Sequence, residues 1–183
     1  MRIMPIGSCV SDDSYEELSR FCYQLGKELA TKSIELILCS PFKMSFDFEL
    51  LQGVLSVPNQ ACRLQLFYPS SDALEKKWYT LLEKLPKGAF IQFTYGGFDV
   101  EDLNARKFAW LYCQLQALEK ADVVLAVGGN EDGASNLFFK IAENQRKNII
   151  PIVQFGGMAK SVFNQRKYQI LDAIGEDIFN KLY

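Results

Sequence analysis

The sequence predicts an α/β fold in which helices cover both faces of a doubly wound, mostly parallel sheet. Short apolar runs alternate with longer amphipathic segments along all 183 residues, as they do in consecutive βα units. The amphipathic segments are long enough to make right-handed crossovers between parallel strands. Several apolar runs end in glycines, which suit the loops at the carboxyl ends of such strands. We therefore expect one domain over residues 1–183, with a Rossmann-like three-layer sandwich.

The first half of the chain is expected to form four strands and three helices. A short strand at residues 1–6 ends at Gly7-Ser8, and a capping box at Ser14 and Glu17 begins an amphipathic helix at 14–31. Two further strands are expected from the apolar runs at 34–39 and 89–94, and a third from the alternating pattern at 63–68. The other two helices are expected at 46–57, which is apolar, and at 72–85, which is amphipathic. Proline follows the apolar helix at position 58 and separates the last helix from the last strand at position 86.

The second half begins with the strongest helical pattern, at residues 103–119. We expect its buried side to consist of the residues at helical spacing, Phe108, Leu111, Tyr112, Leu115 and Leu118. Trp110 and Tyr112 suit either the core or a dimer surface, and the pattern does not decide between them. The remaining elements are expected to be strands at 122–127 and 149–153, a helix at 134–144, and one or two closing helices at 163–183 that are interrupted near Gly175.

The composition excludes several classes of function. The net charge of -2 gives no reason to expect nucleic-acid binding, and no apolar run is long enough to span a membrane. The sequence has no histidine and five cysteines without Cys-x-x-Cys spacing, which argues against a structural zinc site and against histidine-based catalysis. Cys22, Cys62 and Cys113 fall in apolar patterns, and reduced core cysteines predict a cytoplasmic location. No cofactor or metal is expected.

Residues 121–159 contain two strands that each end in a glycine pair. The first strand ends at Gly128-Gly129 and is followed by a polar turn and a helix, and the second ends near Gly156-Gly157. In a parallel sheet both pairs would lie at the edge where ligands bind. Glycine backbone N–H groups can approach an anion closely, and the following helix adds the positive end of its dipole. Gly7-Ser8 is a second candidate phosphate site, or a plain tight turn.

The same region resembles the SLOG superfamily. The resemblance is carried by Ala-Asp-Val-Val-Leu-Ala-Val-Gly-Gly at 121–129 and by Ile-Ile-Pro-Ile-Val-Gln-Phe-Gly-Gly-Met-Ala at 149–159. This superfamily includes nucleotide phosphoribohydrolases of the LOG type, DprA-like DNA-processing proteins, and sensor domains found beside sirtuin or TIR domains in antiphage defence. The dinucleotide-binding pattern Gly-x-Gly-x-x-Gly is absent after the first strand, which argues against an ordinary NAD dehydrogenase.

The family's enzymes carry Gly-Gly-x-Gly-Thr-x-x-Glu, whose glutamate helps to cleave an N-glycosidic bond. Aligning that motif on Gly133 places Leu137 at the glutamate position, and leucine cannot act as an acid, base or nucleophile. Three other carboxylates, Glu131, Asp132 and Glu143, do not stand at the matching place. The resemblance therefore implies a binding domain more readily than an enzyme.

We expect a sensor of a nucleotide-derived signal, such as a cyclic ADP-ribose variant, that regulates an effector domain or protein in antiviral defence. The chain is expected to be a fragment of a larger effector or to act in trans, and to form a homodimer or larger assembly. The alternative is an N-glycoside hydrolase or transferase with a rearranged carboxylate, and a third possibility is a structural oligomerisation domain with an empty site. The base, linkage and phosphate number of the ligand stay open.

The resemblance assigns expected roles to thirteen residues around the ligand. Backbone donors to phosphate are Gly7, Ser8, Gly128, Gly129 and Gly133, and the Gly156 and Gly157 loop would close over the ligand. Side chains at the helix start, Asn130, Ser135 and Asn136, would add contacts. Arg106 and Lys160 would neutralise charge, although a surface ion pair would also explain Arg106. Phe155, or alternatively Phe98, would stack on a base.

Overall fold

The computed structural model describes residues 1–8, 15–43, 45–83, 85, 88–130 and 132–174. Its strands are β1 (Arg2–Ser8), β2 (Glu35–Leu38), β3 (Arg63–Pro69), β4 (Phe90–Tyr95), β5 (Val123–Gly128) and β6 (Asn148–Ile152). Its helices are α1 (Tyr15–Ala30), α2 (Phe46–Leu55), α3 (Asp72–Leu82), α4 (Leu103–Lys120), α5 (Ala134–Asn144) and α6 (Gly157–Ile174), with a short 3-10 turn, η2, at Val153–Phe155. None of the helices in these residues is long and apolar enough to cross a membrane.

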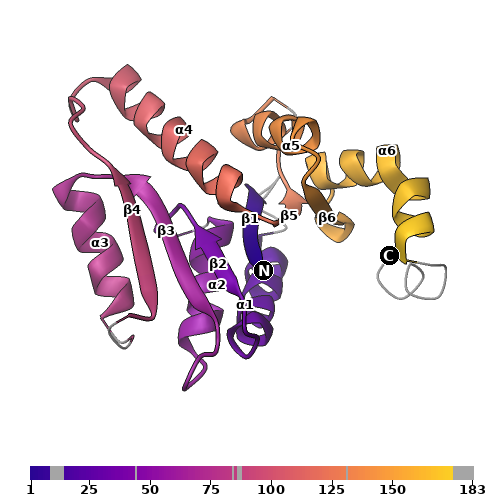
Figure 1. Ribbon diagram of the computed structural model, residues 1–183, viewed down its shortest axis with the longest axis horizontal. Coiled ribbons are helices and arrows are strands. Elements are labelled where there is room, and N and C mark those ends of the chain that lie inside the picture. The colour runs from indigo at the N-terminus through magenta and orange to yellow at the C-terminus, as the bar shows by residue number, and fades with distance from the viewer. Residues whose placement is uncertain (9–14, 44, 84, 86–87, 131, 175–183) are drawn as a thin grey trace.

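The six strands form one parallel sheet in the order β4-β3-β2-β1-β5-β6. One apolar cluster, on one face of the sheet, contains the buried residues of α1, α2 and α3, and a second cluster, on the other face, contains those of α4, α5 and α6 (Figure 1). The chain leaves β1 in one direction to build β2, β3 and β4. It then crosses back over the second face to add β5 and β6 on the other side of β1. The expected doubly wound α/β sandwich is confirmed.

The central strand β1 is fixed to β5 at both ends. At its start, the Arg2 guanidinium and the Asp122 carboxylate form an ion pair of 2.7 Å, and the Arg2 backbone N–H donates to the same carboxylate. This pairing lowers the pKa of Asp122 to about 2. At its other end, a Cβ at Gly7 would lie 1.8 Å from the Val127 carbonyl oxygen. Glycine at this position therefore allows the two strands to stay paired as far as Ser8 and Gly128.

Helices α1 and α2 cross in close contact on the first face of the sheet. A Cβ at Gly26 would lie 2.1 Å from the Leu50 carbonyl oxygen, and a Cβ at Gly53 would lie 2.0 Å from that of Tyr23. Two glycines on facing helices thus bring the two backbones together.

The expected buried face of α4 is confirmed at Leu118 and wrong at Phe108 and Tyr112, while Leu111 and Leu115 are partly buried against the core. Its buried residues are Ala109, Cys113, Ala117 and Leu118, whereas Phe108 is 56% exposed and Tyr112 is 39% exposed. Small residues spaced by four let the helix lie close to the sheet, and Phe108 and Tyr112 are turned outward. Periodicity located the helix, but the apolar residues that form its strongest stripe do not all face the core.

The closing helix also differs from the expectation. It begins at Gly157, six residues before the expected start, so the second glycine pair lies at the start of a helix and not within a long loop. The η2 turn separates it from β6. The expected cap at Ser14 and the expected break near Gly175 lie outside the described residues.

Candidate functional site

The first two glycine segments meet where the direction of the chain reverses in the sheet. Ser8 and Gly128 are paired at the ends of β1 and β5, and the Gly129 backbone N–H donates to the Ser8 carbonyl oxygen over 2.9 Å. Open α/β sheets bind ligands at the carboxyl edge where the strand order changes direction, and β1 and β5 are the strands on either side of that point. The expected candidates Gly7, Ser8, Gly128 and Gly129 therefore occupy one place.

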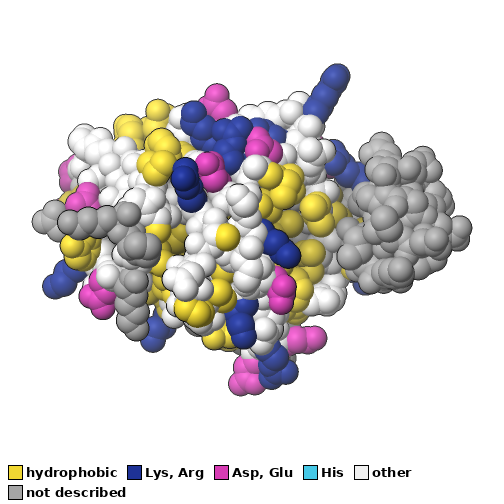
Figure 2. All heavy atoms as spheres, turned by 60° about the horizontal axis from the view of Figure 1, so that its bottom comes forward, with side chains coloured by type: hydrophobic (Ala, Val, Ile, Leu, Met, Phe, Trp, Pro, Cys, Tyr) yellow, Lys and Arg dark blue, Asp and Glu magenta, His cyan; other side chains and the backbone are white. Residues whose placement is uncertain are grey.

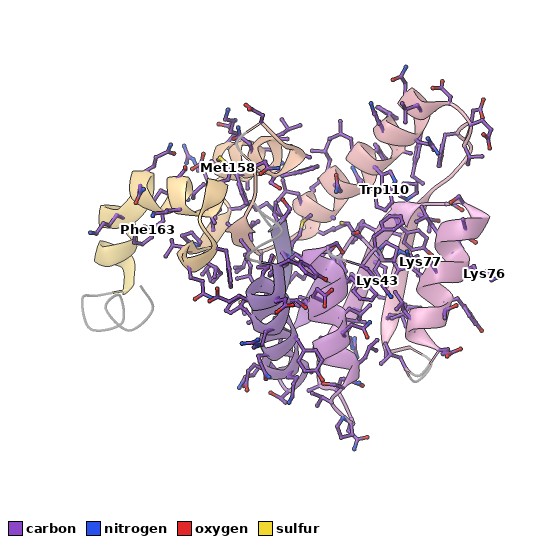
Figure 3. All side chains as sticks on the ribbon, turned by 180° about the vertical axis from the view of Figure 1, so that it is seen from behind. Lys43, Lys76, Lys77, Trp110, Met158 and Phe163 are labelled. Carbon is purple, nitrogen blue, oxygen red and sulfur yellow. The ribbon has the colours of Figure 1, made fainter. Side chains whose placement is uncertain are left out.

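The third glycine segment is joined to the same place. The Met158 backbone N–H donates to the Gly129 carbonyl oxygen over 2.9 Å, which holds the start of α6 beside the end of β5. Figure 3 shows Met158 at this start of α6. A side chain at Gly129, whose φ is 87°, would place its Cβ 3.0 Å from the Ser135 Cβ. Gly156 and Gly157 also have positive φ, at 67° and 59°.

Helix α5 begins beside these loops without a side-chain cap. Its N-cap is Gly133, whose N–H donates to the Asn130 carbonyl oxygen over 3.2 Å, and no described side chain accepts a capping hydrogen bond. The first backbone N–H groups of α5 thus give the edge a partial positive charge. Ser135 and Asn136 lie in this first turn, as expected.

A small cavity of about 110 Å³ lies between the start of α5, the end of β1 and the loop after β2. Its polar lining comes from five elements of the fold: Gly7, Ser40, Ser45, Asp47, Gln114 and Ser135. Of these, only Gly7 and Ser135 were expected at the site. Ser40, Ser45 and Asp47 come from the β2–α2 segment, and Gln114 lies on α4.

Asp47 is the notable member of this lining. One of its oxygens, Oδ2, accepts hydrogen bonds from the backbone N–H groups of Cys39, at 2.6 Å, and Ser40, at 2.8 Å. Burial raises the pKa of this carboxyl to about 6, and the two backbone donors oppose that increase. Burial also raises the pKa of the neighbouring Cys39 thiol well above its usual value, with a further contribution from the charge of Asp47. A carboxyl group that titrates near neutrality therefore faces the cavity.

Sequence reasoning missed Asp47, although a signal was present. It is an acidic residue in the first turn of the largely apolar helix α2, two positions after the N-cap Ser45. An acidic residue at the start of a helix has an ordinary explanation in the helix dipole, so position alone does not mark it. The missing information was its burial, at 9% exposed, and the approach of Cys39 and Ser40 from the end of β2.

Of the remaining expected residues, Phe155, Arg106 and Phe98 lie away from this site. Phe155 is buried in the core with its ring 5.2 Å from that of Phe21, so its expected stacking on a base is replaced by internal packing. Lys160 is exposed on α6. Arg106 and Phe98 line a different cavity, at the ends of β3 and β4. Leu137, at the place of the family's glutamate, is 46% exposed.

Two other features lie outside this site. A larger cavity of about 820 Å³ lies between the end of α2 and the segment before β4, and the described residues of its lining include Ser56, Asn59 and Gln60 but no charged side chain. On the face that lies at the bottom of Figure 1, basic and acidic side chains are interspersed with hydrophobic ones (Figure 2). Among the described residues no group of histidine, cysteine or carboxylate side chains could hold a metal ion.

The class that fold and site define is a Rossmann-like α/β protein with a glycine-lined edge beside its central strand. No protein-family model and no curated protein matches the sequence. Among solved structures, the chain is similar to the X-ray structure of TM1055, a target of the Northeast Structural Genomics Consortium. The TM-score is 0.55 at 18% sequence identity, over 89% of this chain and 80% of the other. This similarity supports the fold.

The raised pKa of Asp47 predicts a specific dependence of stability on pH. Because the folded state holds this proton more tightly than the unfolded state, where the pKa is near 3.8, the contribution is fully present at low pH and is lost as the pH rises through about 6. Between about pH 4 and pH 7, the unfolding free energy of the wild type should fall relative to Asp47→Asn by on the order of 2–3 kcal/mol.

Denaturant unfolding of both proteins across this range measures the difference. Cys39, the other titratable group beside Asp47, stays neutral throughout because its pKa lies well above its usual 9.0. Parallel stability curves for the two proteins would contradict the raised pKa of Asp47, because they would show that its carboxyl group titrates as it does in the unfolded chain.

Proposed function

We propose that this protein binds a nucleotide-derived signal at the glycine-lined edge and acts as a sensor domain of the SLOG kind. The observation that carries the proposal is the meeting of Gly7-Ser8 with Gly128-Gly129 beside the uncapped start of α5. The first N–H groups of α5 form a site for phosphate without any cationic side chain, while the N–H groups of Gly129 and Gly133 already donate to the carbonyl oxygens of Ser8 and Asn130 and hold the loops beside it. That suits an edge from which Arg106 is absent and near which Lys160 is exposed.

The small cavity would receive the part of the ligand next to the phosphate. Asp47 accepts hydrogen bonds and Gln114 can both donate and accept them, which matches the hydroxyl groups of a ribose. A volume of about 110 Å³ accommodates a group of that size but not a whole nucleotide. The base would therefore lie outside this cavity.

The identity of the signal rests on the resemblance of the sequence to SLOG sensor domains. An NAD-derived molecule, such as a cyclic ADP-ribose variant, has the phosphate and ribose groups that the edge and the cavity suit. Binding would then regulate an effector domain or protein, which in that family serves antiviral defence. The TM1055 similarity adds support for the fold that such a domain needs, at 18% identity.

Ser135→Asp tests the phosphate site while protecting the fold. The new carboxylate would lie in the first turn of α5, where negative charge stabilises a helix, and it would repel a bound phosphate. We expect the affinity for ADP-ribose, measured by calorimetry, to fall by about tenfold or more, while the melting temperature is unchanged or slightly higher.

The uncharged variant Ser135→Asn is the matched control. It is close in size to aspartate but adds no charge, so it should retain most of the affinity. If both variants bind ADP-ribose as the wild type does, the phosphate does not lie at the start of α5, and the site assignment is wrong.

A second candidate function is favoured by Asp47 alone. A buried carboxyl group with a pKa of about 6 can exchange a proton near neutral pH, as a general acid or base requires. It could replace the missing glutamate of the family's N-glycoside hydrolases and transferases, although it projects from α2 and not from α5. We place this candidate second because the Asp47 carboxylate already holds the backbone of Cys39 and Ser40.

Base release decides between the two candidates. If the protein is a sensor, incubation with AMP, NAD or ADP-ribose should release no free base above background, as chromatography would show. Turnover that disappears in Asp47→Asn, while the variant stays folded, would instead establish the hydrolase or transferase. Turnover that survives in Asp47→Asn but is lost on changing Asp132 or Glu143 would assign the reaction to another carboxylate.

We also propose that the protein forms a homodimer through β4 and α4. The edge strand β4 has Ile91 54% exposed and Phe93 38% exposed, and α4 adds Phe108 and Tyr112 beside them. The Tyr95 ring lies 4.7 Å from that of Tyr112, which joins the two elements into one apolar surface. Such a surface on an unpaired edge strand is a site for association.

Sedimentation at micromolar concentration tests this dimer. The wild type should sediment as a dimer, and Phe108→Glu should sediment as a monomer because it places a charge within the apolar surface. Tyr79→Glu is the matched control, since Tyr79 is 73% exposed on α3 and lies outside this surface. A wild type that is monomeric with and without ADP-ribose would exclude the homodimer.

A further inference from the structure

A third cavity, larger than the one beside Asp47, lies at the carboxyl ends of β3 and β4, away from the glycine-lined edge. Its volume is about 570 Å³, within the range of small-molecule sites. It is enclosed by the end of β3 and the start of α3, by the β4–α4 loop, and by the first turns of α4. Its lining is Pro69, Ser70, Ser71, Ala73, Leu74, Phe98, Val100, Glu101, Arg106 and Trp110. No residue of this lining belongs to the glycine-lined edge or to the small cavity with Asp47.

Aromatic side chains provide flat surfaces in this cavity. Trp110 is half-buried, and its ring contacts Phe42 at 6.0 Å between centroids. The Lys77 ammonium lies 4.4 Å from the centre of the Phe42 ring, so Trp110, Phe42 and the Lys77 cation are in contact one after another. Figure 3 shows Trp110 on α4, with Lys43 and Lys77 lying between α2 and α3. Phe98, which the sequence marked as a candidate for stacking, lines the same cavity.

The polar groups of the cavity favour an anion. Arg106 forms no ion pair with any acidic side chain that the structure describes, although a surface ion pair was one of its two expected roles. The hydroxyl group of Ser71, the N-cap of α3, makes no capping hydrogen bond. Glu101 also lines the cavity, and like Arg106 it is exposed, so solvent screens the charge of both side chains. Arg106 therefore offers a guanidinium that a carboxylate or phosphate can engage through two hydrogen bonds.

We propose that this cavity is a second binding site, for a planar aromatic ligand that carries an anionic group. The ring lies against Trp110, and the anion meets Arg106 and the Ser71 hydroxyl at the start of α3. A nucleoside monophosphate combines both features and has a size that suits the cavity. The site does not depend on the proposed function, because it is built from other residues at other strand ends.

Tryptophan fluorescence reads this site directly, because the chain has only 2 tryptophans and the other, Trp78, is fully buried. Trp78→Phe leaves Trp110 as the single reporter, and no described group accepts a hydrogen bond from the Trp78 indole, so none is lost. AMP should quench Trp110 by stacking on it, whereas inorganic phosphate should not. Adenosine, which lacks the anion, should bind about tenfold more weakly than AMP.

Matched variants separate this site from general electrostatics and from the glycine-lined edge. Arg106→Ala should weaken the quenching affinity for AMP by about tenfold, and Lys107→Ala, which removes an adjacent exposed charge outside the cavity, should leave it unchanged. Quenching should also persist in Ser135→Asp. Should Trp78→Phe fold poorly, the difference in AMP quenching between the wild type and Trp110→Phe supplies the same signal.

The proposal is overturned if AMP leaves Trp110 fluorescence unchanged, or if Arg106→Ala and Lys107→Ala weaken the quenching equally. It is also overturned if quenching is lost in a folded Ser135→Asp protein, because Trp110 would then report the glycine-lined edge. Persistence of the Trp110 signal together with no effect of Ser135→Asp on ADP-ribose binding would sustain this second site, while contradicting the proposed phosphate site.

Discussion

The pairing of β1 with β5 is the constraint on which the rest of the structure depends. These strands belong to the two halves of the sheet, and 120 positions separate Arg2 from its partner Asp122. The pairing extends to the carboxyl edge only because Gly7 has no side chain that would clash with the Val127 carbonyl oxygen. It then brings Ser8 and Gly129 within hydrogen-bonding distance. The sheet and the candidate phosphate site thus share one requirement, and a side chain at Gly7 would disturb both.

The order and type of the elements could be predicted from sequence because local patterns determine them. Helix α5 has the expected bounds, and each strand lies within two residues of its predicted position. The buried face of α4 could not be predicted, since it depends on how closely Ala109, Cys113 and Ala117 approach the sheet. Asp47 was missed for the same reason: its burial arises from contacts with the end of β2 that no local pattern records. The position of the glycine pairs could be predicted, by contrast, because each pair follows a strand that the local apolar pattern already indicates.

Helix α4 relates the two cavities to each other. Arg106, Trp110 and Gln114 are spaced by four residues, so they lie near one side of the helix at intervals of about 6 Å along its axis. The first two line the cavity at β3 and β4, and the third lines the small cavity beside Gly7. The expectation that placed Arg106 at the glycine-lined edge is therefore replaced by a position at the ends of β3 and β4. One helix therefore lines both cavities with residues from one of its sides.

The charges at the glycine-lined edge bear on which ligands it can select. The start of α5 attracts an anion, while Asp47, once ionised above a pH of about 6, repels one from the adjoining cavity. A free polyanion would be attracted by the start of α5 and repelled by the Asp47 carboxylate. A molecule with phosphate at one end and hydroxyl groups at the other satisfies both, because the hydroxyls donate hydrogen bonds to the carboxylate. Under the proposed function, Asp47 thus discriminates between nucleotides and inorganic phosphates, and it does so without taking part in any reaction.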